Sequence, residues 1–450
     1  MATATDALSV QHLISPASLP ANDKGLSVVS YNVLLPNSSD GWWNYKMYNP
    51  PLEQQDLSNW DYRRQLLQER LRTINADVIC LQEIAPDSFE EDFAFMKEEL
   101  GYDGVELYKK KGRFRPATFW KTSHCQLAGP AVHKDRAIIT AFTTVNGDDK
   151  SCWYVVNCHL QAGKQGPRRL RQMNEAVRGA MTLSRKLKQP TPEQSIRLIV
   201  CGDMNGGPEC GAVRFLEDGF IDETFREDNE PVSSGRKELP LAEPMKDATA
   251  AVVTRHPPPT MVVAELMQSL MEEATYDTPT FSQDMKDRLA RIYKRLASSD
   301  KNTLTRQDVE QWLVQINGRL GRGDEYRNAA LEMGWTDPEA TAAGEVVPWE
   351  EQKKRIKLPS EDTATLSLEG FINVYQKELK GGKFWGIAHD MAVLGDPLPD
   401  CGLFTARYDR IYCSAALQPT AVLDTLADKP CPNEQEPSDH LPVAVAFQAV

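Results

Sequence analysis

The feature that most constrains this chain is a series of short apolar segments, each of which ends in polar residues. They are SYNVL with Asn32, CLQE with Glu83, NCHL with His159, GDMN with Asp203 and Asn205, RYDRIY with Asp409, and PSDHLPV with Asp439 and His440. Apolar runs of this length are typical of buried strands. A residue at the end of such a strand is held rigidly and still reaches a ligand, as in the active sites of layered α/β folds. The series therefore predicts one site built from strand ends.

Helical patterns lie between these strands. Residues Trp60–Ala76 and Arg168–Lys188 carry apolar side chains at helical spacing, and the second segment ends before Pro190. Strands with interspersed helices predict an α/β or α+β fold of layered sheets with helices outside.

The pattern changes within residues 256–395, where strand signals almost vanish after the sequence HPPP. Four segments there are predicted as helices: Glu265–Glu273, Met285–Leu296, Gln307–Leu320 and Leu368–Leu379. We therefore expect a flexible tail at 1–25, a catalytic domain formed by 26–255 and 396–450, and an all-helical insertion at 256–395. Without the insertion, the chain has an ordinary length for one α/β domain.

The insertion resembles a degenerate EF-hand module. If Leu304 takes the eighth loop position of KNTLTRQDVEQW, then Ala297 is first and Asp308 twelfth; in a second, similar segment Gly370 stands where the final Glu belongs. Calcium binding needs early carboxylates and a terminal bidentate Glu, so calcium is not expected as a cofactor. We expect the insertion to bind a protein partner or to cover the catalytic cleft.

Composition excludes some classes of protein. The chain has 51 basic and 64 acidic residues, a formal charge of −13, which excludes a sequence-independent nucleic-acid coat. Its nine Cys include no CxxC pair, so neither zinc nor a disulfide framework is expected. A cytoplasmic location is the default expectation, with the nucleus or an organelle left open. No membrane span is expected, because no apolar run reaches about 18 residues.

The residue types at the strand ends suit one kind of chemistry. Carboxylate and amide oxygens are ligands for Mg²⁺, and two His without Cys partners suit proton transfer or a hydrogen bond to an oxyanion. Metal, His and Asn together favour hydrolysis of a phosphoester. Taken singly, GDMN is equally consistent with a turn, and His159 with a core histidine. Their joint occurrence favours a site.

The whole motif set resembles the endonuclease/exonuclease/phosphatase superfamily, and within it the nocturnin- and deadenylase-like branch. The resemblance rests on SYNVL, NWDYRRQLL, NADVICLQE, ATFWKTS, NCHL, RRLRQ, GDMN and PSDHLPV, and covers about residues 26–225 and 396–450. It implies a four-layered α/β sandwich of two packed sheets with outer helices. The leucine-rich repeats that some deadenylases carry are absent, and the large helical insertion is foreign to that branch.

The resemblance also implies a metal site. Glu83 is expected as the principal Mg²⁺ ligand, helped by Asn32 and Asp439. One or two Mg²⁺ ions are expected, and Mn²⁺ is expected to substitute.

Catalytic roles follow from the same resemblance. Asp203 is expected to orient or deprotonate the attacking water, while Asn205 and His159 contact the scissile phosphate. His440, oriented by Asp409, is expected to stabilise the phosphoryl charge or transfer a proton.

Substrate contacts are less sharply indicated. Basic runs at 109–115 and 164–171 flank the motif strands and either receive a polyanion or form a solvated face. Arg169 matches the branch, Lys121 ends its substrate-side strand, and Trp42 is placed to stack on a base, to pack or to form a lid.

The resulting hypothesis is a Mg²⁺-dependent phosphodiesterase, such as a 3′-exonuclease acting on RNA or nucleotides through water attack on phosphorus. One alternative is an inositol-phosphate or phospholipid phosphoesterase. Another is a non-catalytic scaffold built on the EF-hand-like insertion. The sequence leaves exo, endo and phosphatase action open.

Overall fold

The chain divides into two compact units in a computed structural model. The sandwich unit comprises Met1–Trp42, Asp56–Val263 and Phe404–Val450, and the helical unit comprises Trp43–Gln55 and Ala264–Leu403. The structure describes residues 25–38, 46–47, 59–112, 114–145, 151–188, 196–251, 257–272, 278–298, 303–337, 354–360, 364–399, 401–423, 425 and 427–450.

The first sheet of the sandwich unit has the strand order β20-β21-β1-β2-β4-β3. Its strands are β1 (Gly25–Asn32), β2 (Val78–Ile84), β3 (Gly104–Leu107), β4 (Arg115–Trp120), β20 (Leu417–Val422) and β21 (Val443–Ala449). Strands β1 and β2 are parallel, and β21 and β4 flank them in antiparallel orientation. The ends of β1 and β2 therefore emerge at the same edge.

The second sheet has the order β14-β19-β9-β8-β7-β5, with β6 also paired to β7. Its strands are β5 (Cys125–Leu127), β6 (Val132–Lys134), β7 (Ala137–Thr144), β8 (Trp153–His159), β9 (Arg197–Asp203), β14 (Lys246–Asp247) and β19 (Asp409–Cys413). The central pair, β8 and β9, is again parallel.

The two sheets pack face to face. Their shared core includes Val28 and Cys80 from the first sheet and Phe142, Trp153 and Ile199 from the second. Both faces of the central strands are buried, which explains why these strands read as continuous apolar runs rather than alternating ones.

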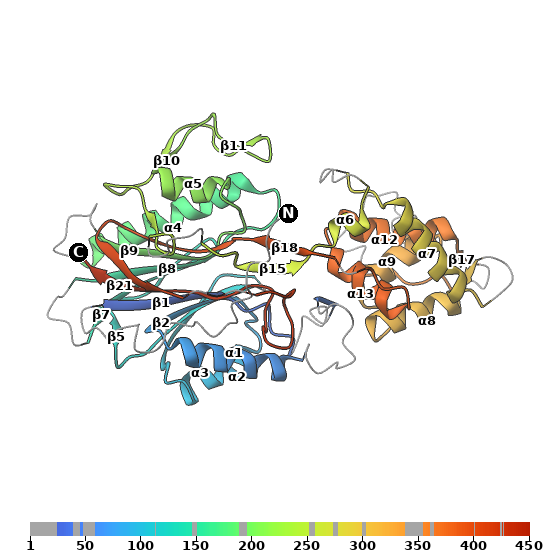
Figure 1. Ribbon diagram of the computed structural model, residues 1–450, viewed down its shortest axis with the longest axis horizontal. Coiled ribbons are helices and arrows are strands. Elements are labelled where there is room, and N and C mark those ends of the chain that lie inside the picture. The colour runs from blue at the N-terminus through green and yellow to red at the C-terminus, as the bar shows by residue number, and fades with distance from the viewer. Residues whose placement is uncertain are drawn as a thin grey trace, which may run out of the picture. The chain divides into compact units, whose positions relative to one another are not determined.

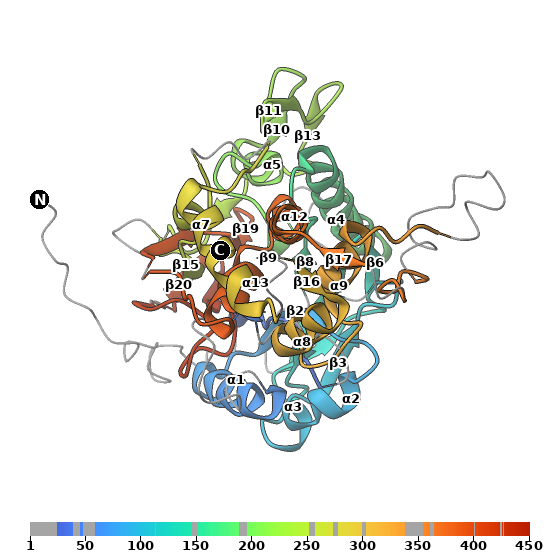
Figure 2. The same ribbon diagram turned by 90° about the vertical axis from the view of Figure 1, so that its right-hand side faces the viewer.

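Helices cover the outer faces of the sandwich (Figures 1 and 2). Helices α1 (Trp60–Ile74), α2 (Phe89–Asp92) and α3 (Ala94–Glu98) pack on the first sheet, and α4 (Gly166–Lys186) and α5 (Gly211–Asp218) on the second. Asn59 caps the start of α1 with its side chain, and Asn75 ends the helix in the left-handed conformation. The predicted four-layered α/β sandwich is confirmed.

Short strands extend the sandwich unit. Two small hairpins follow α5: β10 (Phe220–Ile221) with β13 (Lys237–Glu238), and β11 (Arg226–Glu227) with β12 (Glu230–Pro231). Strands β15 (Met261–Ala264) and β18 (Leu403–Ala406) pair where the chain passes between the two units.

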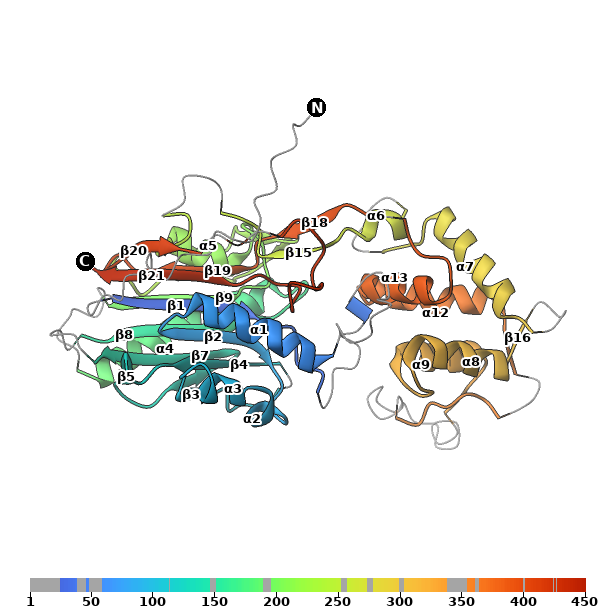
Figure 3. The same cartoon turned by 60° about the horizontal axis from the view of Figure 1, so that its bottom comes forward.

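The helical unit contains α6 (Met267–Leu270), α7 (Gln283–Leu296), α8 (Arg306–Asn317), α9 (Gly323–Glu332), α12 (Leu368–Lys380) and α13 (Phe384–Val393) (Figure 3). Its own apolar core is centred on Trp312, Phe371 and Tyr375. The unit starts later than the expected residue 256 and also takes in Trp43–Gln55. Lys46 explains this addition, because its buried ammonium lies 3.1 Å from Glu325 and 3.0 Å from Asp390.

The helical unit also holds a ladder that the sequence pattern did not indicate. Strand β16 (Leu304–Thr305) pairs with β17 (Thr365–Leu366), so the unit is not wholly helical. After each strand a side chain caps the next helix: Thr305 forms a capping box with Asp308, and Ser367 accepts from the Gly370 N–H at 3.0 Å. Asp308 is thus occupied by its own helix. The EF-hand resemblance stays a prediction.

Among the residues that the structure describes, no helix is both long and apolar enough to cross a membrane.

Candidate active site

The polar strand ends lie at one edge of the sandwich unit. Asn32 ends β1, and Glu83 lies near the end of the parallel strand β2. In the second sheet His159 pairs with Asp203, and Asp203 pairs in turn with Asp409. Five residues distant in the sequence are thus brought together by strand direction and register.

A hydrogen bond joins the two sheets at this edge. Asn32 Nδ2 donates to Asp203 Oδ2 at 3.0 Å and lies 3.3 Å from Glu83 Oε1. The Asn32 carbonyl oxygen, Oδ1, accepts from the Leu34 N–H at 3.1 Å, which fixes the orientation of the amide. Asn32 therefore fixes the spacing between the carboxylates of the two sheets.

Glu83 has a special backbone conformation. Its φ is +63°, and the register between β2 and β4 shifts between Leu81 and Ile84. A bulge of this kind re-aims a side chain, and positive φ in a residue other than glycine is strained. The carboxylate accepts from the Leu35 N–H at 3.2 Å. The strain is consistent with a functional role for Glu83.

Asp203 and Asn205 form a tight turn after β9. Asp203 Oδ1 accepts from the Asn205 N–H at 2.8 Å, and the Asn205 side chain donates to the Leu160 carbonyl at 3.0 Å. Just before them, Gly202 has φ +140°, and a Cβ there would lie 1.8 Å from the Cys158 carbonyl oxygen. Only glycine fits at this close approach.

His159 faces the same carboxylates. Its Nε2 lies 3.6 Å from Asp203 Oδ2 and 3.9 Å from Glu83 Oε1, while its buried Nδ1 has no hydrogen-bond partner among the described residues. Burial lowers the pKa of His159, although the two carboxylates oppose this shift. A neutral His159 ring suits hydrogen bonding to a phosphate oxygen.

His440 and Asp409 form a buried pair. The Nδ1 atom of His440 lies 2.7 Å from Asp409 Oδ2, and its Nε2 lies 3.9 Å from Asp203 Oδ2. Burial alone would lower the pKa of His440, but the charges of Asp409, Asp439 and Asp203 outweigh it and hold that pKa well above its ordinary value. These carboxylates favour the charged form of His440, whose Nε2 faces Asp203.

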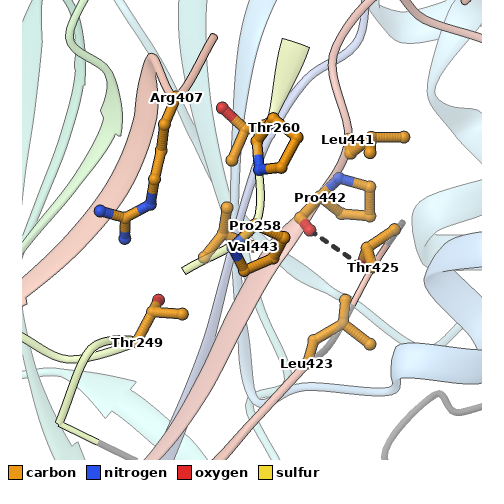
Figure 4. A pocket seen from close by; sticks show the side chains of 10 residues that line it. Thr249, Pro258, Thr260, Arg407, Leu423, Thr425, Leu441, Pro442 and Val443 are labelled. Carbon is orange, nitrogen blue, oxygen red and sulfur yellow. Dashed lines mark hydrogen bonds between the residues drawn. The ribbon is translucent and has the colours of Figure 1, made fainter. Parts of the chain in front are cut away.

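Thr260 supports the pair from behind. Its hydroxyl accepts from the backbone N–H groups of Tyr408 at 3.1 Å and Asp409 at 2.9 Å, and its carbonyl accepts from the Leu441 N–H at 2.7 Å. Thr260 and Leu441 line a narrow hollow with Pro442 and other residues (Figure 4). The segment just before β15 is thus bonded to the backbone of Asp409 itself and, through Leu441, to the residue next to His440.

Negative charge accumulates at the site. Glu83, Asp203, Asp409 and Asp439 form no ion pair with any described Lys or Arg side chain. Burial, followed by the charges of Asp203 and Asp409, raises the pKa of Asp439, although the charge of His440 opposes this. Ligand atoms of Asp203, Asp409 and His440 lie within 4.8 Å of one another. A single charged His440 balances only one of the four carboxylates, and an oxygen-rich set with excess negative charge fits a hard divalent cation.

The tightest group of ligand atoms differs from the predicted metal ligands Asn32, Glu83 and Asp439. In it, His440 and Asp409 already bond to each other, which favours an acid–base role for that pair over metal ligation. The side chain of Glu83 is more exposed than that of Asp203, at 18% against 2%. We keep Glu83 and Asp439 as the proposed metal ligands, and Asn32 as a ligand through Oδ1 in place of that atom's bond from the Leu34 N–H, because its Nδ2 is a donor to the carboxylates.

The structure corrects the prediction for Lys121. Because β4 runs antiparallel to β2, Trp120 pairs with Val78 at the start of β2, one strand length from Glu83. Lys121 donates there to Asn75 and lies 4.9 Å from the ring centre of Tyr102. Lys121 does follow the predicted strand directly, but the antiparallel direction of β4 places this end of the strand at the edge of the sheet opposite Glu83.

Arg169 is buried and already engaged. Its guanidinium pairs with Glu227 and donates to the carbonyls of Gln161 at 2.7 Å and Gly163 at 2.5 Å. It therefore positions the loop after His159, and its side chain is only 3% exposed. Trp42, the remaining predicted substrate contact, lies outside the described residues.

Two supporting features were missed from the sequence. Arg63 of α1 is fully buried and donates to the carbonyls of Val33 at 2.8 Å and Pro437 at 2.8 Å. It thereby holds together the loops that carry Asn32 and Asp439. The sequence signal that could have revealed this role is the position of Arg63 on the apolar face of α1, where its neighbours Trp60 and Leu67 are buried. Below the site, Gln82 Nε2 donates across the sheets to Asn157 Oδ1 at 2.9 Å.

Comparison with known families agrees with this geometry. The model of the Endonuclease/Exonuclease/phosphatase family matches residues 29–440. The chain belongs to the endonuclease/exonuclease/phosphatase family.

Curated relatives support the nocturnin- and deadenylase-like branch. The chain is 27% identical to mouse 2′,5′-phosphodiesterase 12 over 257 residues, which is 50% of this chain and 40% of that protein. It is 25% identical to zebrafish (Danio rerio) protein angel homolog 2 over 233 residues, 48% of this chain and 38% of the relative. It is 23% identical to the Ccr4 3′-5′-exoribonuclease subunit of the CCR4-Not complex from Schizosaccharomyces pombe over 263 residues, 47% and 37% of the two chains. The chain thus matches about two fifths of the length of these relatives.

A solved structure shares the fold. The crystal structure of ANGEL2, a 2′,3′-cyclic phosphatase, in complex with adenosine-2′,3′-vanadate aligns with a TM-score of 0.53. The alignment has 14% identity and covers 95% of this chain and 96% of ANGEL2.

Proposed function

We propose that this chain is a Mg²⁺-dependent phosphoester hydrolase, most simply a phosphodiesterase or 3′-exonuclease acting on RNA or nucleotides. The observation that carries the proposal is the contact between Asn32 and Asp203 at 3.0 Å, which joins the strand ends of both sheets into one acidic site. His159 and His440 border the same carboxylates. Membership of the family supports this class of reaction.

The side chains divide the work in a consistent way. Glu83, Asn32 and Asp439 hold the cation, which when bound neutralises part of the phosphate charge. Asp203 accepts a proton from the attacking water as its oxygen bonds to phosphorus; the scissile P–O bond breaks, and the leaving oxygen takes a proton from solvent. The 2.8 Å bond from the Asn205 backbone keeps Asp203 oriented.

The site also offers hydrogen-bond donors to the phosphate. The ring of His159 and the amide of Asn205 contact the phosphate oxygens, Asn205 by exchanging one of the two bonds that its Nδ2 makes to Leu160 and Asp203. His440 Nδ1 is bonded to Asp409 at 2.7 Å, while its Nε2 makes no hydrogen bond with any residue that the structure describes. A charged His440 donates from Nε2 to the phosphoryl oxygen on which negative charge develops.

Substrate class is proposed from the relatives. Their names describe a 2′,5′-phosphodiesterase, a 3′-5′-exoribonuclease and a 2′,3′-cyclic phosphatase, all of which act on phosphoesters of ribonucleotides. RNA and its degradation products are therefore the first substrates to test, ahead of inositol phosphates and phospholipids.

A hydrolysis screen tests the proposal. The purified chain is incubated with Mg²⁺ and, in parallel, a 3′-5′-linked oligoribonucleotide, a 2′,5′-linked oligoadenylate, an RNA ending in a 2′,3′-cyclic phosphate, and a phosphoinositide. We expect Mg²⁺-dependent hydrolysis of a ribonucleotide substrate, and a loss of about 10²-fold or more in His440→Ala. The exposed His124 supplies the matched control, His124→Ala, which should keep full activity.

Two results would contradict the proposed function. One is the absence of hydrolysis of every substrate by the wild-type chain. The other is full activity in His440→Ala.

A further inference from the structure

Cationic side chains gather beside the candidate site on three neighbouring segments of the sandwich unit. They belong to the loop between β3 and β4, the turn between β6 and β7, and the first turns of α4. We call this set the basic rim: Lys109, Lys110, Lys111, Arg136, Arg168 and Arg171.

Strand pairing places all three segments at the edge that carries the site. The loop between β3 and β4 leads into Arg115, which pairs with Ile84 directly after Glu83. The turn between β6 and β7 contacts the site histidine His159, because the His159 N–H donates to the Arg136 carbonyl at 3.0 Å. Helix α4 begins at Gly166, a few residues after His159.

The first two segments form one connected structure. The Tyr108 hydroxyl donates to the Lys134 carbonyl at 2.7 Å and accepts from the Arg136 N–H at 2.9 Å. In addition, the Lys109 N–H donates to His133 Nδ1 at 3.3 Å. Specific bonds thus join the start of the loop between β3 and β4 to the turn between β6 and β7.

Arg136 is the innermost cation of the rim. Its φ is +58°, a strained conformation for a residue with a side chain, and the residue is only partly exposed. Its guanidinium makes no hydrogen bond or ion pair with any described residue. Burial and the charge of Arg168 lower its pKa, against the opposing charges of Asp135 and Glu83. A partly buried, unpaired arginine beside the site is well placed to take a phosphate.

The rim keeps an excess of positive charge. Glu106 lies 2.7 Å from Lys109, and Asp135 lies 3.7 Å from Arg168 and 3.4 Å from Arg171. The remaining lysines, 110 and 111, are exposed and have no partner among the described residues. Within a chain of net charge −13, this surface attracts a polyanion.

We propose that the basic rim binds phosphates of single-stranded RNA beyond the scissile linkage, so that the chain prefers an oligonucleotide to a dinucleotide. The inference deepens the proposed function and rests on it. Arg136 takes the phosphate adjoining the site, and Lys110 and Lys111 take phosphates further along the strand. Point charges on lysines contact backbone phosphates without reading sequence.

The test measures binding apart from hydrolysis. A fluorescent 12-nucleotide RNA and a labelled dinucleotide are titrated with wild-type protein in EDTA, and anisotropy is recorded at several salt concentrations. The variant is Lys110→Ala/Lys111→Ala. The matched control is Lys97→Ala/Lys186→Ala, which removes two exposed cations, from α3 and from the far end of α4.

We expect the rim variant to bind the 12-mer about tenfold more weakly than wild type, with a logarithmic salt slope that is smaller by about 1.4, or about 0.7 for each lysine removed. The control double variant should match wild type. Circular dichroism of each variant checks that the fold is intact.

Two outcomes would overturn the inference: equal affinity of the rim variant and wild type for the 12-mer, or no preference of wild type for the 12-mer over the dinucleotide. The proposed function is tested separately by the hydrolysis screen. If the chain cleaves RNA but shows no preference for the 12-mer, the proposed function stands and the inference about the basic rim is wrong.

Discussion

At the scale of single residues, the site depends on a charge balance set by burial. Asp409 is fully buried and His440 nearly so, and each supplies the other's main polar contact. A buried pair of this kind is costly to break because the remaining group loses its partner. The protonation state of His440 is therefore a property of its neighbours as much as of its own ring.

We predict that Asp409→Asn lowers the pKa of His440. Burial disfavours the charged ring, and without the Asp409 carboxylate only the charges of Asp439 and Asp203 oppose it. A titration of the ring nitrogens by NMR in metal-free protein measures the shift. The variant should also lose about 10²-fold or more in rate. An unchanged pKa of His440 in Asp409→Asn would show that the pair does not set its charge.

The same substitution has a defined effect on stability. In wild type the pKa of His440 is raised by folding, so its charged form contributes stability that is complete below about pH 6.5 and is lost as the pH rises through the folded pKa. The deficit in unfolding free energy of Asp409→Asn should therefore shrink as the pH rises. Urea unfolding at several pH values measures this trend.

Residues of the site were predictable because strands and their ends leave a strong local pattern. Asn32, Glu83 and His159 follow apolar runs that the sequence displays directly. The position of Lys121 was not predictable, since it depends on the antiparallel direction of β4 against β2. Arg136 was missed for a similar reason: its place beside the site comes from the pairing of β7 with β8.

At the scale of elements, the important connection is between β15, β18 and the acid–base pair. The Thr260 N–H donates to Ala406 at 2.9 Å, and Met261 forms a bridge with His440. The two chain segments that lead to and from the helical unit are therefore bonded to the backbone that carries Asp409 and His440. Thr260 is a positioning residue for this pair.

We predict that Thr260→Val lowers kcat by about tenfold with little change in KM, because the pair shifts while substrate contacts remain. Two backbone N–H groups also lose their acceptor, which costs about 1–3 kcal/mol of stability for each buried group left unpaired. Thr260→Ser should restore kcat, since serine keeps the hydroxyl.

Thr73→Val on α1 is the matched control, because its hydroxyl bonds only within the helix and is exposed. Equal kcat in Thr260→Val and Thr73→Val would refute the positioning role. Failure of Thr260→Ser to recover activity would refute it as well.

Element boundaries show where local pattern fails. The long helices α4 and α7 follow from spacing of apolar residues, as does the core of the sandwich. The ladder of β16 and β17 was missed because two-residue strands carry no periodicity. The assignment of Trp43–Gln55 to the helical unit depends on Lys46 and its distant partners, which no local pattern reveals.

At the scale of the whole molecule, the chain combines the sandwich fold of its family with a separate helical unit. The sandwich unit carries the candidate site and the basic rim, and the helical unit has a separate apolar core. The net charge of −13 does not conflict with an RNA substrate, because the rim concentrates cations beside the site. A protein partner for the helical unit remains a prediction.

The central claim is that the strand-end carboxylates form a divalent-metal site for phosphoester hydrolysis. The Mg²⁺ dependence of the hydrolysis rate in wild type and in Glu83→Gln tests this claim most directly. The control is Glu69→Gln, which changes an exposed glutamate of α1. We predict a wild-type rate that saturates with Mg²⁺ and vanishes in EDTA, a Glu83→Gln variant that needs at least about tenfold more Mg²⁺ or is inactive, and a control equal to wild type. Wild-type activity that resists EDTA, or a Glu83→Gln curve that overlays the wild-type curve, would contradict the account.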